Sequence, residues 1–251
     1  MSSFITGRVQ GQWLLRRPNA VAACRIFCFP YSGVGASMYA RWPEWAGPAE
    51  VCPVQPPGRE NRLTEPHYGT FETLAEQLIP ELEPYLDRPF AFFGHCSSAL
   101  AGFAVATRLA EAGLPTPSRL FVSSQVAPHE PPYGRFLAMN DDELTAELAG
   151  LTRSMGGDPV PGLLDLWLSV MKADIAAHKA YQIPEPSRLA AGVSVIGWDQ
   201  DQEVPPELMA GWRGYSDDVR FITLRGSHHT FLDAPLALTA ELAHDMRQVA
   251  Q

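Results

Sequence analysis

The segment from Phe90 to Leu100 constrains the fold more than any other part of the chain. It reads Phe-Ala-Phe-Phe-Gly-His-Cys-Ser-Ser-Ala-Leu, an apolar run that meets a tight turn and continues into alanine-rich sequence. A strand that passes through such a turn into a helix forces the central side chain outward at the end of a sheet, beside the next residue's N–H. The segment therefore predicts a strand–turn–helix element with Cys96 as a nucleophile and the Ser97 N–H as an oxyanion donor.

The same turn also has an ordinary structural interpretation. Free cysteines are most often small buried hydrophobic residues, and a Gly-x-Cys-x-small match arises often by chance. Ser98 stands where a second glycine is commoner in such turns, which is a mild departure. The catalytic interpretation of Cys96 therefore depends on whether an acid and a base follow it in the chain.

Short β-rich runs alternate with helical periodicity along most of the chain. Between the strands, apolar residues recur at helical spacing, as in Phe71, Leu74, Leu78 and Leu82. The predicted strands are Arg25–Phe29, Val51–Val54, Phe90–Gly94, Arg119–Ser124, Val193–Gly197 and Val219–Leu224. This alternation predicts an α/β fold with a doubly wound, mostly parallel sheet, and chemistry at the carboxyl ends of the strands.

One segment, residues 140–181, breaks this alternation. Helical patterns follow one another there with no strand between them. We interpret the segment as a helical lid inserted into a single domain that spans residues 1–251. Within the lid, Trp167, Leu168 and Met171 belong to an apolar stripe. Such a stripe is more often plain packing, but over the strand ends it would line an acyl substrate channel.

The composition excludes several classes of function. The net charge is −9 and the basic residues are scattered, which does not favour binding of nucleic acid. No run of about 18 apolar residues predicts a membrane span, and Met1–Arg17 lacks an apolar core followed by a small-residue cleavage site. We therefore expect a soluble cytoplasmic protein with no membrane partner, and a monomer by default.

The cysteines indicate neither a metal site nor a disulfide framework. Cys24, Cys28 and Cys52 lie in or beside apolar segments. The chain lacks the paired Cys-x-x-Cys spacing with histidines that zinc sites use. We expect these three cysteines in the core and no bound metal.

Two late loops carry the residue types that a cysteine nucleophile needs. The thiolate is the attacking form, and because an unperturbed thiol has a pKa of about 8.5, a base must lie near it. In this architecture an acid and then a histidine follow late strands. Asp199 and Asp201 follow one late strand, and His228 and His229 follow the last. The spacing leaves both choices open, and His95 is given a supporting role.

Further motifs carry a family resemblance. Residues 28–37 read Cys-Phe-Pro-Tyr-Ser-Gly-Val-Gly-Ala-Ser, and residues 57–60 read Pro-Gly-Arg-Glu. These segments, with residues 88–95, resemble the type II thioesterases of nonribosomal-peptide and polyketide assembly lines, which are α/β-hydrolases acting on acyl groups tethered to carrier proteins. In that family the first segment reads Phe-Pro-His-Ala-Gly-Gly, so Tyr31 and Ser32 replace histidine and alanine.

The resemblance implies an assignment for the site. The family's histidine follows Gly-x and precedes a proline by seven residues, which fits His228, and its acid is the later aspartate of its loop, which fits Asp201. Its second oxyanion N–H implies the backbone of Ser32 beside that of Ser97. No cofactor is implied, because the acyl group arrives on the phosphopantetheine of an acyl or peptidyl carrier protein.

The implied function is thioester hydrolysis through an acyl-S-Cys96 intermediate. With cysteine this intermediate is itself a thioester and keeps its activation, so one alternative is an acyl- or aminoacyltransferase that passes the group to a second carrier protein or an amine. Another alternative is a catalytically silent scaffold, since Tyr31, Ser32, Cys96 and Ser98 all depart from the usual pattern. A third is that Cys96 is an engineered replacement of serine that traps turnover.

Overall fold

A seven-stranded sheet organises the computed structural model, which describes residues 13–154 and 156–249. The strand order is β2-β3-β1-β4-β5-β6-β7, and only β2 runs antiparallel to its neighbour. The strands are β1 (Cys24–Cys28), β2 (Trp45–Ala46), β3 (Ala49–Pro53), β4 (Phe90–His95), β5 (Arg119–Ser123), β6 (Gly192–Trp198) and β7 (Val219–Leu224). The predicted α/β-hydrolase fold is confirmed, and the short edge strand β2 is the addition to the six predicted strands.

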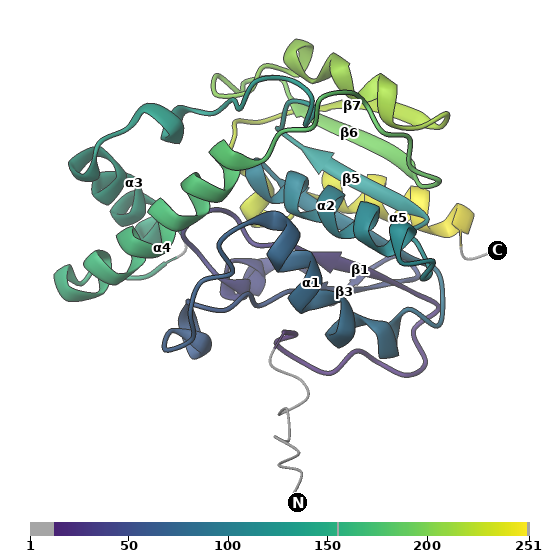
Figure 1. The fold of residues 1–251 in the computed structure, drawn as a ribbon, viewed down its shortest axis with the longest axis horizontal. Coiled ribbons are helices and arrows are strands. Elements are labelled where there is room, and N and C mark those ends of the chain that lie inside the picture. The colour runs from purple at the N-terminus through teal and green to yellow at the C-terminus, as the bar shows by residue number, and fades with distance from the viewer. Residues whose placement is uncertain (1–12, 155, 250–251) are drawn as a thin grey trace, which may run out of the picture.

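Helices cover both faces of the sheet (Figure 1). The α-helices are α1 (Phe71–Leu82), α2 (Ser97–Glu111), α3 (Asp141–Ser154), α4 (Pro161–Ala180) and α5 (Leu236–Val249), and short 3-10 segments include η1 (Ala36–Arg41), η4 (Arg135–Ala138), η5 (Pro206–Tyr215) and η6 (Thr230–Asp233). Side chains alternate across a strand. Phe27 and Phe92 therefore pack with α1 and α2, whereas Ile26 and Phe93 join the core beneath α5.

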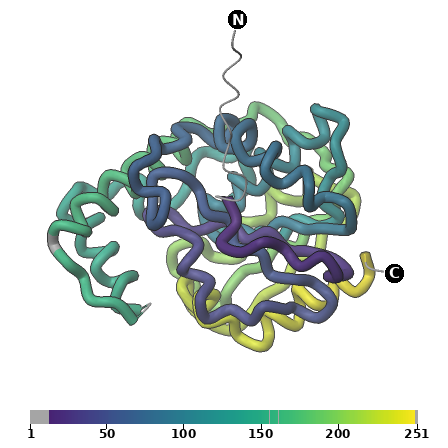
Figure 2. The backbone as a smooth tube through the Cα atoms, turned by 90° about the horizontal axis from the view of Figure 1, so that it is seen from below, coloured from purple at the N-terminus to yellow at the C-terminus, as the bar shows by residue number. Residues whose placement is uncertain are grey.

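The α3–α4 pair projects from the side of the sheet, as Figures 1 and 2 show. It lies within the predicted insertion 140–181 and separates β5 from β6 in the chain. Asn140 caps α3, because its side-chain oxygen accepts the Glu143 N–H at 3.0 Å while the Glu143 carboxylate accepts the Asn140 N–H at 2.8 Å. The division of the chain into a single domain and a lid stays a prediction.

Several expectations from composition concern burial and surface. Cys24, Cys28 and Cys52 are buried, as predicted.

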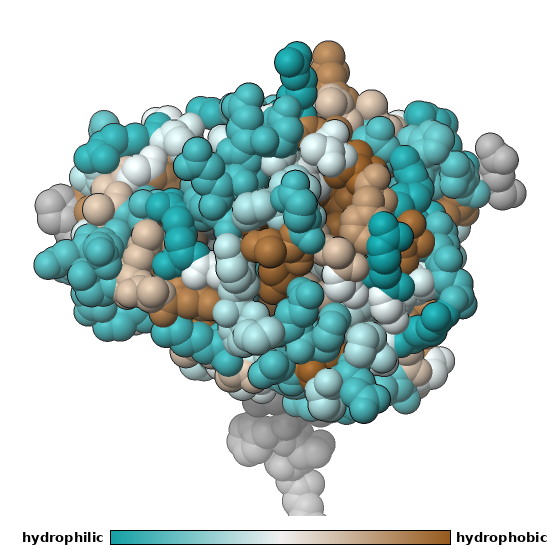
Figure 3. Space-filling model, turned by 90° about the horizontal axis from the view of Figure 1, so that it is seen from above, coloured by the Kyte–Doolittle hydropathy of each residue, from teal (hydrophilic) through white to brown (hydrophobic). Residues whose placement is uncertain are grey.

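Among the described residues, none of the helices combines the length and apolar character that crossing a membrane requires. The prediction for Met1–Arg17 falls mostly outside the described residues. The face drawn in Figure 3 shows apolar side chains in separate patches with polar groups between them.

Candidate active site

Cys96 lies at the junction of β4 and α2 in a backbone conformation that L-residues rarely adopt. Its φ is 55° and its ψ is −141°, and α2 begins at the next residue. The turn is so tight that a Cβ atom on Gly94 would lie 2.4 Å from the Ala99 nitrogen, so only glycine fits there. Strained residues of this kind cluster at active sites. The strand–turn–helix element predicted from the sequence is therefore present.

Ser98, which departs from the commoner glycine, stabilises this turn. Its hydroxyl donates to the His95 carbonyl at 2.8 Å and accepts the His95 N–H at 2.9 Å. Both backbone groups are buried, where unpaired polar groups are costly. The serine thus satisfies two groups that a glycine would leave to other partners.

Asp201 and His228 come together at the carboxyl ends of β6 and β7. His228 Nδ1 lies 2.9 Å from Asp201 Oδ2, and that oxygen also accepts the Ser124 hydroxyl at 2.7 Å. The other carboxylate oxygen accepts the N–H groups of Glu203 and Val204 at 2.8 and 3.0 Å. Burial raises the pKa of Asp201, but these hydrogen bonds, led by that of His228, lower the pKa by more than burial raises it. The acid therefore stays ionised.

The imidazole of His228 is arranged to hold a proton beside the thiol. Burial lowers its pKa, whereas the hydrogen bond to Asp201 and the neighbouring Cys96 side chain raise it, to about 10 overall. Nε2 has no hydrogen-bond partner within the described residues, and the Glu203 carboxylate lies 3.6 Å from it. Contacts between a nucleophile and its base are often loose without substrate.

The competing residues of each loop have other partners. Asp199 accepts the Gly226 N–H at 2.9 Å and so joins the two loops. The imidazole of His229 makes no hydrogen bond to a described residue through Nε2, and burial lowers its pKa to about 4. His95 is buried, with Nδ1 2.9 Å from the Ser123 hydroxyl, and it stacks on a phenylalanine of η6. The geometry thus favours Asp201 and His228 over their neighbours, and a structural role for His95.

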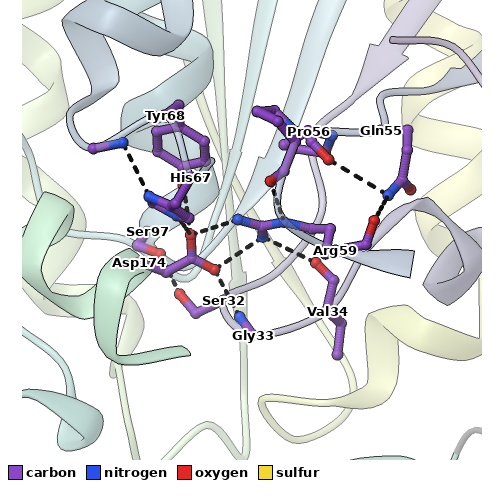
Figure 4. Close-up of polar contacts among 12 residues, drawn as sticks. Ser32, Gly33, Val34, Gln55, Pro56, Arg59, His67, Tyr68, Ser97 and Asp174 are labelled. Atoms are coloured by element: carbon purple, nitrogen blue, oxygen red, sulfur yellow. Dashed lines mark hydrogen bonds and ion pairs between the residues drawn. The ribbon is translucent and has the colours of Figure 1, made fainter. Parts of the chain in front are cut away.

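The two backbone N–H groups expected to stabilise an oxyanion come from adjacent segments. Ser32 lies in the loop after β1, Ser97 is the first residue of α2, and their hydroxyls are 2.7 Å apart (Figure 4). N–H groups in the first turn of a helix have no intrahelical partner and point at anions. The hydroxyl pair links the two segments beside the thiol.

A cluster that the sequence analysis missed holds the loop after β1. We call it the Asp174 cluster; it consists of Gly33, Arg59, His67, Tyr68 and Asp174 (Figure 4). The buried carboxylate, on α4, accepts the Gly33 N–H at 2.8 Å and two hydrogen bonds from Arg59 at 2.9 Å each. It also accepts the Tyr68 hydroxyl at 2.6 Å and lies 2.8 Å from His67 Nε2. One carboxylate therefore joins four segments of the chain.

The charge of Asp174 is stable in this environment. Burial raises its pKa, but the Arg59 guanidinium and the hydrogen bonds around it lower the pKa well below its usual range. Because Gly33 directly follows Ser32, the cluster fixes the loop after β1, which carries the proposed oxyanion donor and is called the oxyanion loop below, to α4. It also explains the Pro-Gly-Arg-Glu motif, whose arginine is the main partner of the carboxylate.

Two of the larger cavities lie near the site. A cavity of about 880 Å³ is lined by residues of the loops after β6 and β7, among them Glu203 and His228. Residues of η4 and of the segment before it complete the lining. A second, of about 370 Å³, lies between α3, α4 and the loop after β1, with Trp167 in its wall. Of the other two channel candidates, Met171 is fully buried and Leu168 is partly buried, and both pack in the cluster that contains Cys96.

Glu203, His228 and His229 are the described residues that could offer ligands to a metal, with ligating atoms within 4.8 Å of one another. Other groups already engage two of them. His228 is bonded to Asp201, and Glu203 pairs with Arg135 Nε at 2.8 Å. A metal bound there would occupy His228 Nε2, which has no hydrogen-bond partner among the described residues. The donor set fits acid–base chemistry better than a resident metal.

The fold and this arrangement define an α/β-hydrolase, with Cys96 in the turn between β4 and α2. The model of the thioesterase domain family matches residues 24–246. The chain belongs to the thioesterase family and is an enzyme that cleaves thioesters.

Individual relatives are similar along nearly the whole chain. Linear gramicidin dehydrogenase LgrE of Brevibacillus parabrevis is 34% identical, with 86% of each chain covered. The type II thioesterase BorB of the borrelidin biosynthetic cluster superposes with a TM-score of 0.79 at 28% identity, covering 95% of this chain and 99% of BorB. The RedJ thioesterase of the prodiginine pathway in Streptomyces coelicolor gives a TM-score of 0.75 at 34% identity, covering 90% and 91%.

Proposed function

We propose that this enzyme hydrolyses acyl groups carried as phosphopantetheine thioesters on acyl or peptidyl carrier proteins of nonribosomal-peptide or polyketide assembly lines. Cys96 is the nucleophile, His228 the acid and base, and Asp201 the residue that orients His228. The similarity to BorB and RedJ, thioesterases of biosynthetic pathways, supports the substrate class. LgrE is named a dehydrogenase, but a nucleophile turn beside a His–Asp pair supports acyl transfer to cysteine.

The first step transfers the acyl group to the enzyme. The Cys96 thiolate, with its proton on His228 Nε2, attacks the thioester carbon. The N–H groups of Ser32 and Ser97 stabilise the negative charge that develops on the carbonyl oxygen. The bond to the pantetheine sulfur then breaks, and His228 donates its proton to the departing thiolate. The products are acyl-S-Cys96 and the free thiol of the carrier arm.

The second step releases the acid. His228 Nε2, now neutral, accepts a proton from water as the water oxygen attacks the acyl carbon. The bond to Cys96 breaks, the carboxylic acid leaves, and the thiolate and imidazolium are restored. Asp201 holds the Nδ1 proton throughout, so Nε2 is the atom that exchanges protons.

One observation carries this proposal. The strained Cys96 lies at the end of β4, and the His228–Asp201 pair, 2.9 Å apart, lies beside it at the ends of β6 and β7. Burial, a charged partner and strain coincide at this point, which is typical of active sites. A scaffold without activity has no need to keep the strained cysteine and the ionised pair together.

The test is to load a carrier protein with a radiolabelled acyl group and to follow both the label and the enzyme's intact mass. We expect free acid to accumulate and an acyl adduct to form on the wild type. The matched Cys96→Ala variant is expected to show neither. An adduct that persists in Cys96→Ala, or no release of acid by the wild type, would refute the proposal.

Transfer to a second acceptor is the alternative that a specific feature favours. Cys96 is 6% exposed and belongs to an apolar cluster, so water has limited access to the acyl-enzyme. The acyl-enzyme is a thioester and keeps the activation of its donor. In the same assay, label that appears on an unloaded second carrier protein or an amine faster than as free acid would favour a transferase.

The lid and its channel form the remaining part of the proposal. We propose that the α3–α4 pair moves to admit the pantetheine arm, and that the cavity beside Trp167 receives the acyl chain, with Leu168 and Met171 behind it. Apolar walls with few polar groups suit an acyl chain. On the face drawn in Figure 3 the apolar patches are separate, so a carrier protein that docks on this face would be guided by charge and shape.

A further inference from the structure

Tyr31 places an unsatisfied hydroxyl in the interior. Its side chain is 1% exposed, and the hydroxyl has no hydrogen-bond partner in the described part of the chain. Three other buried tyrosines each have a partner: Tyr39 donates to the Phe29 carbonyl at 2.5 Å, Tyr68 donates to Asp174, and Tyr215 accepts the His129 N–H. An unpaired buried hydroxyl is uncommon and calls for an explanation.

The ring of Tyr31 lies beside His228 and His229. The ring centroid is 5.9 Å from that of His228, 5.8 Å from that of His229 and 5.7 Å from that of Phe136. Tyr31 also directly precedes Ser32, whose N–H faces the acyl oxygen in the proposed mechanism. Its side chain therefore starts one residue from the group that holds the carbonyl.

Tyr31 remains a hydrogen-bond donor at neutral pH. Burial raises the pKa of its hydroxyl, and the negative charge of Cys96 raises it further. The neighbouring His229, with its lowered pKa, is neutral, and its Nε2 is also unpaired among described residues. A donor and a potential acceptor, neither with a partner among the described residues, thus belong to neighbouring rings.

We propose that Tyr31 selects acyl groups that carry a hydroxyl on the carbon next to the thioester carbonyl or on the one after it. The tyrosine hydroxyl donates to this substituent, which in turn donates to His229. An ammonium group has no lone pair to accept the hydrogen bond that Tyr31 donates, so we expect it to be disfavoured at the same place. This inference rests on the proposed thioesterase function. Tyr31, which stands where the type II thioesterases have histidine, is then a residue that determines substrate specificity.

The experiment compares pantetheine thioesters of butyrate, 2-hydroxybutyrate, 3-hydroxybutyrate and 3-aminobutyrate. We expect wild-type kcat/KM for at least one hydroxybutyryl probe to exceed that for butyryl by about 3- to 10-fold, the range for one hydrogen bond. In Tyr31→Phe this ratio is expected to fall towards one. The aminobutyryl probe is expected to be poorer than butyryl with the wild type.

Tyr39→Phe is the matched control, because it removes a hydroxyl that has a partner. It should lower the melting temperature and leave the hydroxybutyryl-to-butyryl ratio unchanged. Tyr31→Phe should not lower the melting temperature, since it removes a buried group that lacks a partner.

Three outcomes overturn the inference. They are a ratio that Tyr31→Phe does not change, a preference of the wild type for the aminobutyryl probe, and a loss of melting temperature in Tyr31→Phe equal to that in Tyr39→Phe. Butyryl turnover separates this failure from failure of the proposed function. If the enzyme hydrolyses the butyryl thioester but shows no preference for the hydroxybutyryl probes, the proposed function stands and this inference is wrong. If it hydrolyses none of the probes, both are wrong.

Discussion

Two buried polar clusters flank the loop that follows β1, and they differ in how fully their hydrogen bonds are satisfied. In the Asp174 cluster, one carboxylate binds four residues from three other segments of the chain. Around Cys96, by contrast, Tyr31 Oη, His228 Nε2 and His229 Nε2 have no partner in the part of the chain that the structure describes.

This difference distinguishes residues that support the loop after β1 from residues that take part in the reaction. A fully bonded buried network is rigid and fixes one backbone arrangement. Polar atoms without partners are costly, and a bound ligand is one way in which their hydrogen bonds are completed. We therefore interpret the Asp174 cluster as the support of the oxyanion loop and the group around Cys96 as the part that meets the substrate. The predictions below test this division.

The largest effect is expected for Asp201→Asn. The amide cannot accept the Nδ1 proton as an ionised carboxylate does, so His228 loses both its orientation and the main cause of its raised pKa. We expect kcat/KM to fall by about 10³- to 10⁴-fold, as for other triads that lose their acid. Steady-state kinetics with a pantetheine thioester provide the measurement.

Asp199→Asn is the matched control for that prediction. Asp199 lies two residues away on the same loop and accepts the Gly226 N–H through one oxygen, which an amide oxygen can replace. It should change kcat/KM by no more than a few fold. Equal losses in the two variants would show that the acid has been assigned to the wrong residue.

Asp174→Asn is expected to have the next largest effect, on stability. It leaves the buried Arg59 charge without its partner, and breaking a buried ion pair in this way costs about 3–5 kcal/mol. Urea unfolding provides the measurement. The control is Asp141→Asn, which breaks an exposed pair with Lys172 between α3 and α4 and should cost no more than about 1 kcal/mol.

The difference between wild type and Asp174→Asn should also depend on pH. Because the pKa of Asp174 is lowered in the folded state, its stabilising effect is present above the unfolded pKa of about 3.9 and is lost as the pH falls through the folded value. The difference should be constant above about pH 5 and narrow below it. A constant difference down to pH 3 would contradict a lowered pKa in the folded state, because the unfolded carboxyl takes up its proton in that range and the folded carboxyl does not. The comparison should extend to the lowest pH at which the protein stays folded.

The sequence predicted the features that depend on neighbouring residues. The strand, turn and helix around Cys96 follow from a short run of the chain, and six strands followed from local composition. The choice of His228 and Asp201 came from family resemblance, because loop spacing alone does not say which of two adjacent side chains turns inward. The hydrogen bond between them is the observation that favours this choice.

The Asp174 cluster could not be assembled in the same way, since Gly33 and Asp174 are 141 residues apart in the chain. A signal was nevertheless present. Asp174 falls on the apolar stripe of α4, where Met171 and Ile175 are buried beside it, and a charge on such a stripe requires a partner. Tyr31 left no comparable signal, because an unpaired hydroxyl is visible only when its surroundings are known.

Cys96→Ala should lower the pKa of His228. The thiolate is one cause of the raised value of about 10, and its removal leaves burial opposed by Asp201 and Glu203. We expect a decrease that is measurable by NMR titration of the imidazole resonances. The matched variant Cys52→Ala, which removes a buried thiol on β3, should leave this pKa unchanged. An unchanged value in Cys96→Ala would mean that the thiol does not interact with the imidazole.

The smallest effect is expected for Ser98→Ala. This variant tests whether the turn at Cys96, like the Asp174 cluster, is stabilised by complete hydrogen bonds. The variant removes two hydrogen bonds to the His95 backbone and should cost about 1–2 kcal/mol in unfolding free energy. Thr145→Ala, which removes an exposed hydroxyl bond within α3, should stay within about 0.5 kcal/mol of the wild type. Because strain at Cys96 depends on the rigidity of the turn, a stability loss in Ser98→Ala should come with a lower kcat. A loss of stability with kcat unchanged would place the constraint on Cys96 in β4 and α2 rather than in Ser98.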